Sequence, residues 1–201
     1  MTLKGICSMD IIRIGLSEKE NCSIDERTDD TIVELVQKGD FKAFEILVSR
    51  YEKKIFRFFF RMGAQASDSE DLTQEVFIQA FRGLSKYQAR NLFSAWIFTI
   101  ARNVYKNFLD KQIRNNKLLN LQKNSEDCHN QVAVTQKNSL DEVEAMLSPL
   151  PEEYRRVMVL KYISDMSCKE ISQIENISES AVKQRLFRAR EMIRETCKSE
   201  F

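Results

Sequence analysis

The stretch SCKEISQIENISESAVKQRLFRAREMIRE (167–195) predicts two short helices separated by a tight turn. Ser167 is a candidate N-cap, and Glu170, three residues later, completes a capping box for the first helix. Residues 175–177 interrupt the apolar spacing, and Ser178 can cap a second helix. The inner face of this second helix carries Val182, Leu186, Ala189 and Ile193.

The outer face of the second helix is polar and mostly basic. It consists of Glu179, Ser180, Lys183, Gln184, Phe187, Arg188 and Arg190. A helix that is buried on one side and basic on the other suits insertion into the major groove of DNA. The alternative is a solvated amphipathic helix at the end of a bundle. The stretch by itself therefore predicts a helix-turn-helix that reads duplex DNA, with a plain bundle helix as the competing interpretation.

Composition extends the helical pattern to the whole chain. The 201 residues include five glycines and two prolines, and 43% are hydrophobic, which predicts an all-α protein with a packed core. The net charge of +1 hides an uneven distribution. One block is acidic (Asp68, Glu70, Asp71, Glu75), and two segments are basic (Arg102, Lys106, Lys111, Arg114 and Lys183, Arg185, Arg188, Arg190, Arg194). Separate charged faces indicate separate partners.

Several classes of protein are disfavoured. The five cysteines are odd in number and lack paired spacing, which indicates reduced thiols in a cytoplasmic protein. Cys128 and His129 have no second ligand pair, so we expect no metal and no cofactor. No segment approaches the roughly 20 apolar residues of a membrane span, and no secretory leader is apparent. A phosphate-binding glycine loop and a nucleophile pattern are also absent from the sequence, so we expect no enzyme.

The chain divides into two predicted helical domains. Residues 1–28 form a loosely ordered extension, in which Met9 is a second candidate for the first residue. The first domain covers 29–115, a flexible linker rich in Asn, Gln and Lys covers 116–138, and the second domain covers 139–201.

Glycines, caps and apolar spacing predict the helices of these domains. The expected helices run from Thr31 to Lys38, from Asp40 to Gly63, from Asp68 or Ser69 to Leu84, and from Leu92 to about Asn115. In the second domain, Ser139 and Glu142 form another capping box, and Pro151 suits a helix start.

Two of these helices have predicted inner stripes. The stripe of the third is Leu72, Val76, Ala80, Phe81 and Leu84, and that of the fourth is Trp96, Ile100, Val104 and Phe108. Because Trp96 falls on this stripe, core packing is favoured for it over a role as a stacking platform.

Three segments together resemble a known family. EDLTQEVFIQAFRGL (70–84) and FSAWIFTIARNVYKNFL (93–109) resemble region 2 of the bacterial sigma-70 family of RNA polymerase sigma factors. LSPLPEEYRRVMVLKYISDMSCKEISQIENISESAVKQRLFRARE (147–191) resembles their region 4. The small two-domain form is similar to the extracytoplasmic-function group, also called group 4. The resemblance covers residues 30–115 and 139–195.

The resemblance implies three binding surfaces. Docking on the β′ clamp helices of core RNA polymerase is implied for Asp71, Gln74, Glu75, Val76, Phe77 and Ile78. Capture of the melted −10 element is implied for Lys86, Tyr87, Arg90, Asn91, Arg102, Asn103, Lys106 and Asn107. Recognition of the −35 element is implied for Ser178, Ser180, Lys183, Gln184, Arg185, Phe187 and Arg188. The residue types agree with these roles. Proteins that bind single-stranded DNA use basic and aromatic side chains, and Arg makes the commonest specific contact with guanine in duplex DNA.

Two residues of the helix-turn-helix depart from the family pattern. Asn176 replaces the glycine common in the turn, which is tolerable because Asn accepts a left-handed conformation. Glu175 stands where an apolar residue is usual, so we expect looser packing there.

The resemblance implies a sigma factor that directs transcription initiation, with core polymerase (β′ clamp helices and β flap) and promoter DNA as partners. It also implies an anti-sigma factor, which in family members lies between the two domains. DNA binding by the isolated chain should be weak, because docking on polymerase is what fixes the spacing of the domains. The alternatives are a stand-alone helix-turn-helix regulator and a helical adaptor that binds protein only.

Overall fold

The described part of the chain is helical throughout. A computed structural model describes residues 27–88, 92–122 and 140–199, and it contains no β-strand within these ranges. The elements are α2 (Asp29–Gln37), η1 (Phe41–Ala43), α3 (Phe44–Arg61), α4 (Ala66–Gly83), η2 (Leu84–Lys86), α5 (Phe93–Gln122), α6 (Leu140–Leu147), α7 (Glu152–Tyr162), α8 (Cys168–Glu175) and α9 (Glu179–Ser199). The prediction of an all-α fold is confirmed. None of the described helices is long and apolar enough to cross a membrane.

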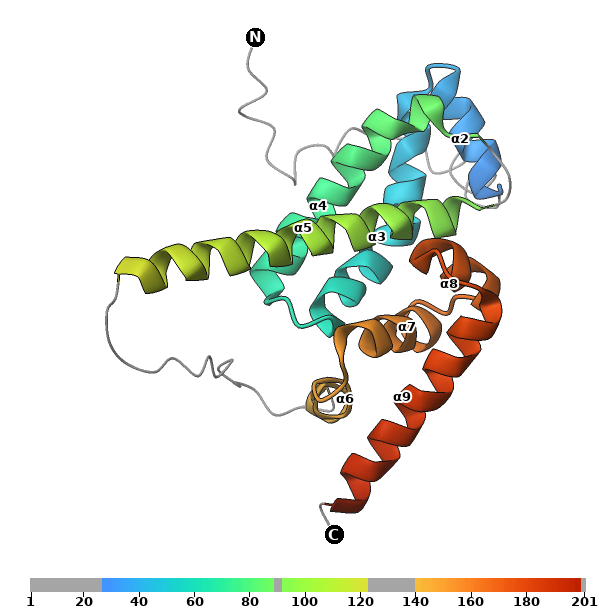
Figure 1. The fold of residues 1–201 in the computed structure, drawn as a ribbon. Helices are drawn as coiled ribbons and strands as arrows, with labels where there is room; N and C mark the ends of the chain where they lie inside the picture. Colours follow the sequence, from blue (N-terminus) through green and yellow to red (C-terminus); the bar gives the residue numbers. More distant parts are fainter. Residues whose placement is uncertain (1–26, 89–91, 123–139, 200–201) are drawn as a thin grey trace.

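Helices α2 to α5 form one packed unit, which we call the N-terminal module (Figure 1). Its centre is aromatic: Phe58, Phe59 and Phe98 are fully buried, and the Phe58 ring meets the Phe98 ring edge-on at a centroid distance of 5.8 Å. The Tyr105 hydroxyl donates to the carbonyl of Met62 at 2.5 Å, which ties α5 to the end of α3. Burial raises the pKa of Tyr105 to about 12, so this phenol stays protonated and keeps its hydrogen bond at physiological pH.

The glycines predicted to end helices are confirmed, and three predicted helix starts are wrong. Gly39 and Gly63 follow α2 and α3 with φ angles of +102° and +98°, which glycine adopts without strain. The first wrong start is that of α2, which begins at Asp29 instead of Thr31. Asp40 precedes η1 rather than α3 and makes no capping bond through its side chain. Helix α4 begins at Ala66, ahead of the expected Asp68 or Ser69. Ser69 does not cap it, since its buried hydroxyl donates to the Gln65 carbonyl at 2.8 Å.

The predicted inner stripes of α4 and α5 need correction. Phe81 is 44% exposed, although the other predicted α4 residues are buried. The deeply buried residues of α5 are Phe93, Ala95, Ile97, Phe98, Ala101, Val104 and Tyr105. Trp96, Ile100 and Phe108 are only partly buried. Helix α5 packs against both α4 and α8, so its buried face is wider than a single stripe and is centred on other residues.

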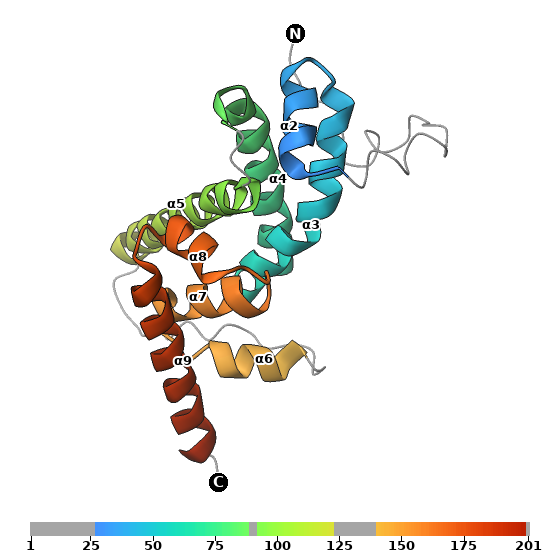
Figure 2. The same cartoon turned by 90° about the vertical axis from the view of Figure 1, so that its right-hand side faces the viewer.

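Helices α6 to α9 form the C-terminal module, which contains the helix-turn-helix (Figure 2). The predicted capping box is confirmed: Glu170 N–H donates to the Ser167 hydroxyl, and Ser167 N–H donates to the Glu170 carboxylate. Asn176 ends α8 in the left-handed conformation, with φ of 53°. Ser178 caps α9 by accepting from Ala181 N–H at 3.2 Å. These local signals therefore place the start of α9 as expected.

Some expected features fall partly or wholly outside the described residues. They are the N-terminal extension, the Ser139 capping box, the Cys128–His129 pair and most of the linker. Helix α5 itself continues to Gln122, past the expected end near Asn115.

The two modules are in direct contact. Both views place α8 beside α5, and α7 lies near the end of α3 (Figures 1 and 2). This arrangement differs from two domains that touch only through a tether.

Candidate nucleic-acid and protein interfaces

The exposed side of α4 combines acid, amide and apolar groups. Asp71, Gln74, Glu75 and Ile78 are exposed, and the Gln79 amide donates to the Glu75 carboxylate at 2.7 Å. Val76 and Phe77 lie beneath this surface in the core, where they support the helix instead of facing solvent. The buried side of α4 is thus packed in the core, while its polar side is exposed and available to a partner.

An aromatic pair, Phe41 and Phe81, extends this surface, and Phe41 was not expected there from the sequence. Phe41 is 65% exposed and Phe81 is 44% exposed, and their ring centroids lie 5.9 Å apart. Phe81 also contacts Phe44 at 5.2 Å. A signal was available, because positions 71, 74, 78 and 81 share one helical face. We call Asp71, Gln74, Glu75, Ile78, Phe81 and Phe41 the α4 surface. Exposed apolar groups rimmed by polar ones are typical of protein interfaces.

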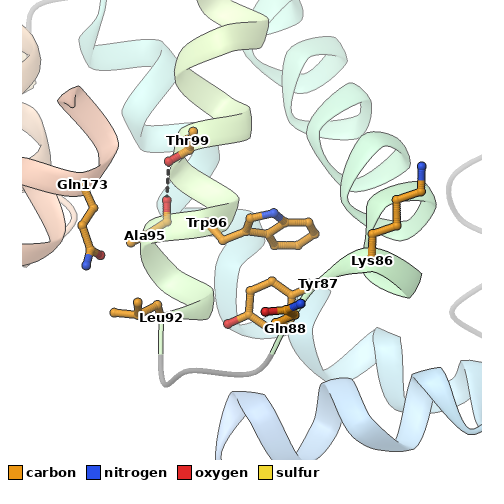
Figure 3. A pocket seen from close by; sticks show the side chains of 8 residues that line it. All are labelled: Lys86, Tyr87, Gln88, Leu92, Ala95, Trp96, Thr99 and Gln173. Atoms are coloured by element: carbon orange, nitrogen blue, oxygen red, sulfur yellow. Dashed lines mark hydrogen bonds between the residues drawn. The ribbon is translucent and has the colours of Figure 1, made fainter.

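A second feature is a pocket of about 410 Å³ beside the start of α5 (Figure 3). It is lined by Lys86, Tyr87, Gln88, Leu92, Ala95, Trp96, Thr99 and Gln173. The Trp96 and Tyr87 rings lie 4.9 Å apart, and Lys86 brings an exposed ammonium group to the rim. Flat aromatic groups beside a cation are what unstacked bases require of a protein. Arg90 and Asn91, which were expected in this loop, lie outside the described residues.

Three residues missed by sequence reasoning, Gly83, Gln37 and Asp30, contact Trp96, Leu84 or Tyr87 from outside the pocket lining. Gly83 lies against the Trp96 indole, since a Cβ added at Gly83 would come within 3.2 Å of that ring. The Gln37 amide donates to the carbonyls of Leu84 and Tyr87 at 2.8 and 2.9 Å. The Tyr87 hydroxyl donates to Asp30 at 3.2 Å. Helix α2 therefore holds the loop in place, a long-range effect without a local sequence signal.

The polar residues of α5 lie in two different environments. Asn103, Lys106 and Asn107 are exposed to solvent. Arg102 is turned toward α8, where its Nη1 donates to the Ile174 carbonyl at 3.1 Å and its Nε lies 3.8 Å from Glu175 Oε1. The structure therefore brings Asn103, Lys106 and Asn107 together and separates Arg102 from them.

The third feature is the outer face of α9. Lys183, Gln184, Phe187 and Arg188 are exposed, and Phe187 has 58% of its surface accessible. Arg185 instead pairs with Glu153 of α7 at 3.0 Å. The hydroxyls of Ser178 and Ser180 lie 2.8 Å apart at the helix start. The exposed face therefore presents the cations Lys183, Arg188 and Arg190 to solvent, with Arg185 held toward its own module.

Glu175 corrects the expectation of a loosely packed turn. Its side chain is 2% exposed, and it accepts from Arg156 Nε at 2.7 Å. Arg156 also pairs with Glu152 of its own helix. A buried carboxylate is tolerated when cations surround it, so Glu175 packs tightly through charge instead of apolar contact.

Comparison with known proteins identifies both modules. Residues 47–115 match the family described as Sigma-70 region 2, and residues 140–193 match the family described as Sigma-70, region 4. The chain is 34% identical to the ECF RNA polymerase sigma-E factor of Haemophilus influenzae, over 84% of this chain and 95% of that protein. It is 31% identical to the ECF RNA polymerase sigma factor SigW of Bacillus subtilis, over 81% of this chain and 92% of that protein.

Solved structures agree in fold. CnrH, in complex with the cytosolic domain of CnrY, matches with a TM-score of 0.67 at 23% identity, over 87% of this chain and 100% of that one. The sigma factor RpoE of Bartonella quintana, in complex with the anti-sigma factor NepR, matches with a TM-score of 0.65 at 22% identity, over 78% and 98%.

Proposed function

The chain belongs to the extracytoplasmic-function sigma factors of RNA polymerase, and we propose that its three surfaces divide promoter recognition among them. The α4 surface docks on core polymerase, the pocket and the polar face of α5 capture melted −10 DNA, and the outer face of α9 reads the −35 duplex. Polymerase supplies the bond chemistry, so the chain acts without a catalytic site of its own, in the cytoplasm.

Docking is supported by the composition of the α4 surface. Carboxylates at Asp71 and Glu75 can accept charge-assisted hydrogen bonds from arginines of a partner helix pair, which fixes register. Ile78, Phe81 and Phe41 add exposed apolar area, which supplies the affinity that exposed charges alone lack. Val76 and Phe77 contribute by keeping α4 rigid.

The pocket beside the start of α5 is the main observation that supports capture of the −10 strand. A base turned out of the duplex can stack on the Trp96 ring, which lies against Gly83 and beside the Tyr87 ring. Lys86 and Lys106 can pair with phosphates, while Asn103 and Asn107 can hydrogen-bond sugars or bases. Arg102, which is bound to α8 here, could join them only if its contact with the Ile174 carbonyl were released.

Recognition of the −35 duplex is supported by the exposed groups of α9. Arg188 is suited to guanine, Gln184 to adenine, and Phe187 to a thymine methyl group. Lys183 is suited to phosphate. Ser178 and Ser180 at the helix start can reach the backbone, although Ser178 also caps the helix. Arg185 then serves as a positioning residue through its pair with Glu153.

Regulation by an anti-sigma factor is a further part of the proposal. A protein that covers the α4 surface or separates the modules would block docking. Copurification of the tagged chain with a protein that inhibits its transcription would support this part, and uninhibited activity in the source cell's extract would contradict it.

Run-off transcription with core polymerase and a promoter library tests the proposal. The wild-type chain should give promoter-specific transcripts, which Asp71→Arg combined with Gln74→Ala should abolish. Glu191→Gln, a change at an exposed glutamate of α9, is the matched control and should leave transcripts intact. Operator binding without polymerase would favour a stand-alone regulator. Binding to polymerase without transcripts from any promoter would favour an adaptor.

A further inference from the structure

Helix α2 contacts the segment that follows α4 through one side chain. The Nε2 atom of Gln37, the last residue of α2, donates to the Leu84 carbonyl at 2.8 Å and to the Tyr87 carbonyl at 2.9 Å. Each proton of the amide therefore has its own backbone acceptor. The two carbonyls belong to residues 47 and 50 positions further along the chain, so this side chain joins the end of one helix to the end of another.

The two carbonyls lie where helical hydrogen bonding stops. The last carbonyls of a helix have no donors within their own helix. Leu84 accepts from the Tyr87 N–H at 3.1 Å, and the backbone becomes extended at Tyr87, with ψ of 131°. Gln37 thus supplies, from α2, donors that a continuing helix would have supplied. It fixes the point at which the chain leaves the helix and passes to the pocket.

Tyr87 is the residue that this arrangement orients. Its carbonyl accepts from Gln37, and its hydroxyl donates to Asp30 at 3.2 Å. Its ring contacts those of Phe93 and Trp96, at centroid distances of 5.8 and 4.9 Å. Asp30 and Gln37 lie near opposite ends of α2. The backbone and the ring of Tyr87 are therefore both fixed against one helix.

Gln37 is not needed to pack α2. Its side chain is exposed, whereas Ile32, Val33 and Val36 bury the other side of the helix. Water competes for the hydrogen bonds of an exposed amide, so these bonds add only modestly to the stability of the fold. Loss of the amide should leave α2 in place and release residues 84–87.

We infer that Gln37 is a positioning residue for base selection in the −10 pocket: it holds residues 84–87, and with them Tyr87 and Lys86, in one arrangement beside Trp96. This role rests on the proposed function, because the arrangement matters only if the pocket takes a melted base. Gln37 does not line the pocket, so it acts through residues that do. A wall held in one arrangement rejects bases that do not fit it, whereas a wall that moves adapts to several.

Gln37→Met and Gln37→Glu test this role, since both keep the length of the side chain and remove its amide donors. Gln37→Glu also places a carboxylate against two carbonyl oxygens, so it should have the larger effect. Ile32→Val, on the buried side of α2, is the matched control. It weakens the packing of the same helix and leaves the Gln37 amide in place.

Trp96, the only tryptophan in the chain, reports the state of the neighbouring Tyr87 in the free protein. Acrylamide quenching of its fluorescence should increase in both Gln37 variants, because the ring beside it is released. Quenching in Ile32→Val should match wild type. Circular dichroism verifies that each variant folds, and if one Gln37 variant fails to fold, the other decides.

Base discrimination is measured by competition binding of polymerase complexes to a promoter recovered from the library, with one position at a time varied among the four bases. At the melted position that is most selective with the wild-type chain, the ratio of best to worst base should fall about five- to tenfold in the Gln37 variants, near the low end for two hydrogen bonds because the amide is exposed. Ratios at the upstream duplex positions should not change. Ile32→Val should keep both sets of ratios.

Unchanged quenching in the folded Gln37 variants would overturn the positioning role, and so would a wild-type ratio at the melted position. Equal losses at melted and upstream positions, or the same loss in Ile32→Val, would show general destabilisation and would overturn it as well. If the wild-type chain gives promoter-specific transcripts while the Gln37 variants discriminate normally, the positioning role fails and the proposed function stands. If no promoter yields transcripts, the proposed function fails and the positioning role fails with it.

Discussion

Replacing Trp96 by Leu should impair promoter melting while preserving the fold. Trp96 is partly buried, so the smaller side chain should cost about 1–2 kcal/mol of the free energy of unfolding. A domain of this kind has roughly 5–15 kcal/mol available, so the variant remains folded. Loss of base stacking should remove about 1–3 kcal/mol of DNA binding, a reduction of roughly five- to 150-fold.

The assay is permanganate reactivity of thymines in the melted region, together with run-off transcription, on a promoter recovered from the library. Trp96→Phe is the matched control: it also shortens the side chain but keeps a flat ring for stacking. We expect Trp96→Phe to retain most open complex and Trp96→Leu to lose most of it. Equal open complex in the two folded variants would refute the reasoning and make Trp96 a packing residue.

Three further predictions concern stability and −35 recognition. Asn176→Ala should cost about 1–2 kcal/mol in urea denaturation because φ is 53°, while Asn176→Gly should be close to neutral; equal losses would contradict a left-handed turn. Burial raises the pKa of the Glu144 carboxyl, and the nearby cations Arg155 and Arg61 oppose part of this rise. Because the charged carboxylate is less favourable in the folded state than in the unfolded one, ionisation of Glu144 lowers the free energy of unfolding as pH rises. Glu144→Gln should therefore raise the free energy of unfolding at about pH 8, by about 0.5 kcal/mol after solvent screening, and by less at about pH 4. A larger gain at the lower pH would contradict this explanation. Arg188→Ala should reduce discrimination at one base pair by about 1–3 kcal/mol in competition binding to polymerase-bound promoters, whereas Lys183→Ala should weaken all promoters alike and lower the salt dependence.

Local signals predicted the helix-turn-helix well. The Ser167 capping box, the left-handed Asn176 and the Ser178 cap each depend on residues within a few positions of one another, so the sequence carries them directly. Gly39 and Gly63 were recognised for the same reason.

Long-range packing was not predictable in this way. The burial of α5 depends on α8 as well as α4, and the Arg102–Ile174 bond joins residues 72 positions apart. Glu175 appeared unfavourable because its partner Arg156 could not be located from spacing. Trp96 packs against the core, as its position on the stripe predicted, but that position gave no information about Gly83 and the pocket beside it.

The central claim is that one chain, docked on polymerase, contacts promoter DNA at two separate places. Footprinting of the polymerase complex on a selected promoter tests this claim most directly. We predict two signals: an upstream duplex segment whose protection is lost with Lys183→Ala and Arg188→Ala combined, and a downstream melted segment whose permanganate reactivity is lost with Trp96→Leu. A single protected segment that forms equally well without polymerase would contradict the account.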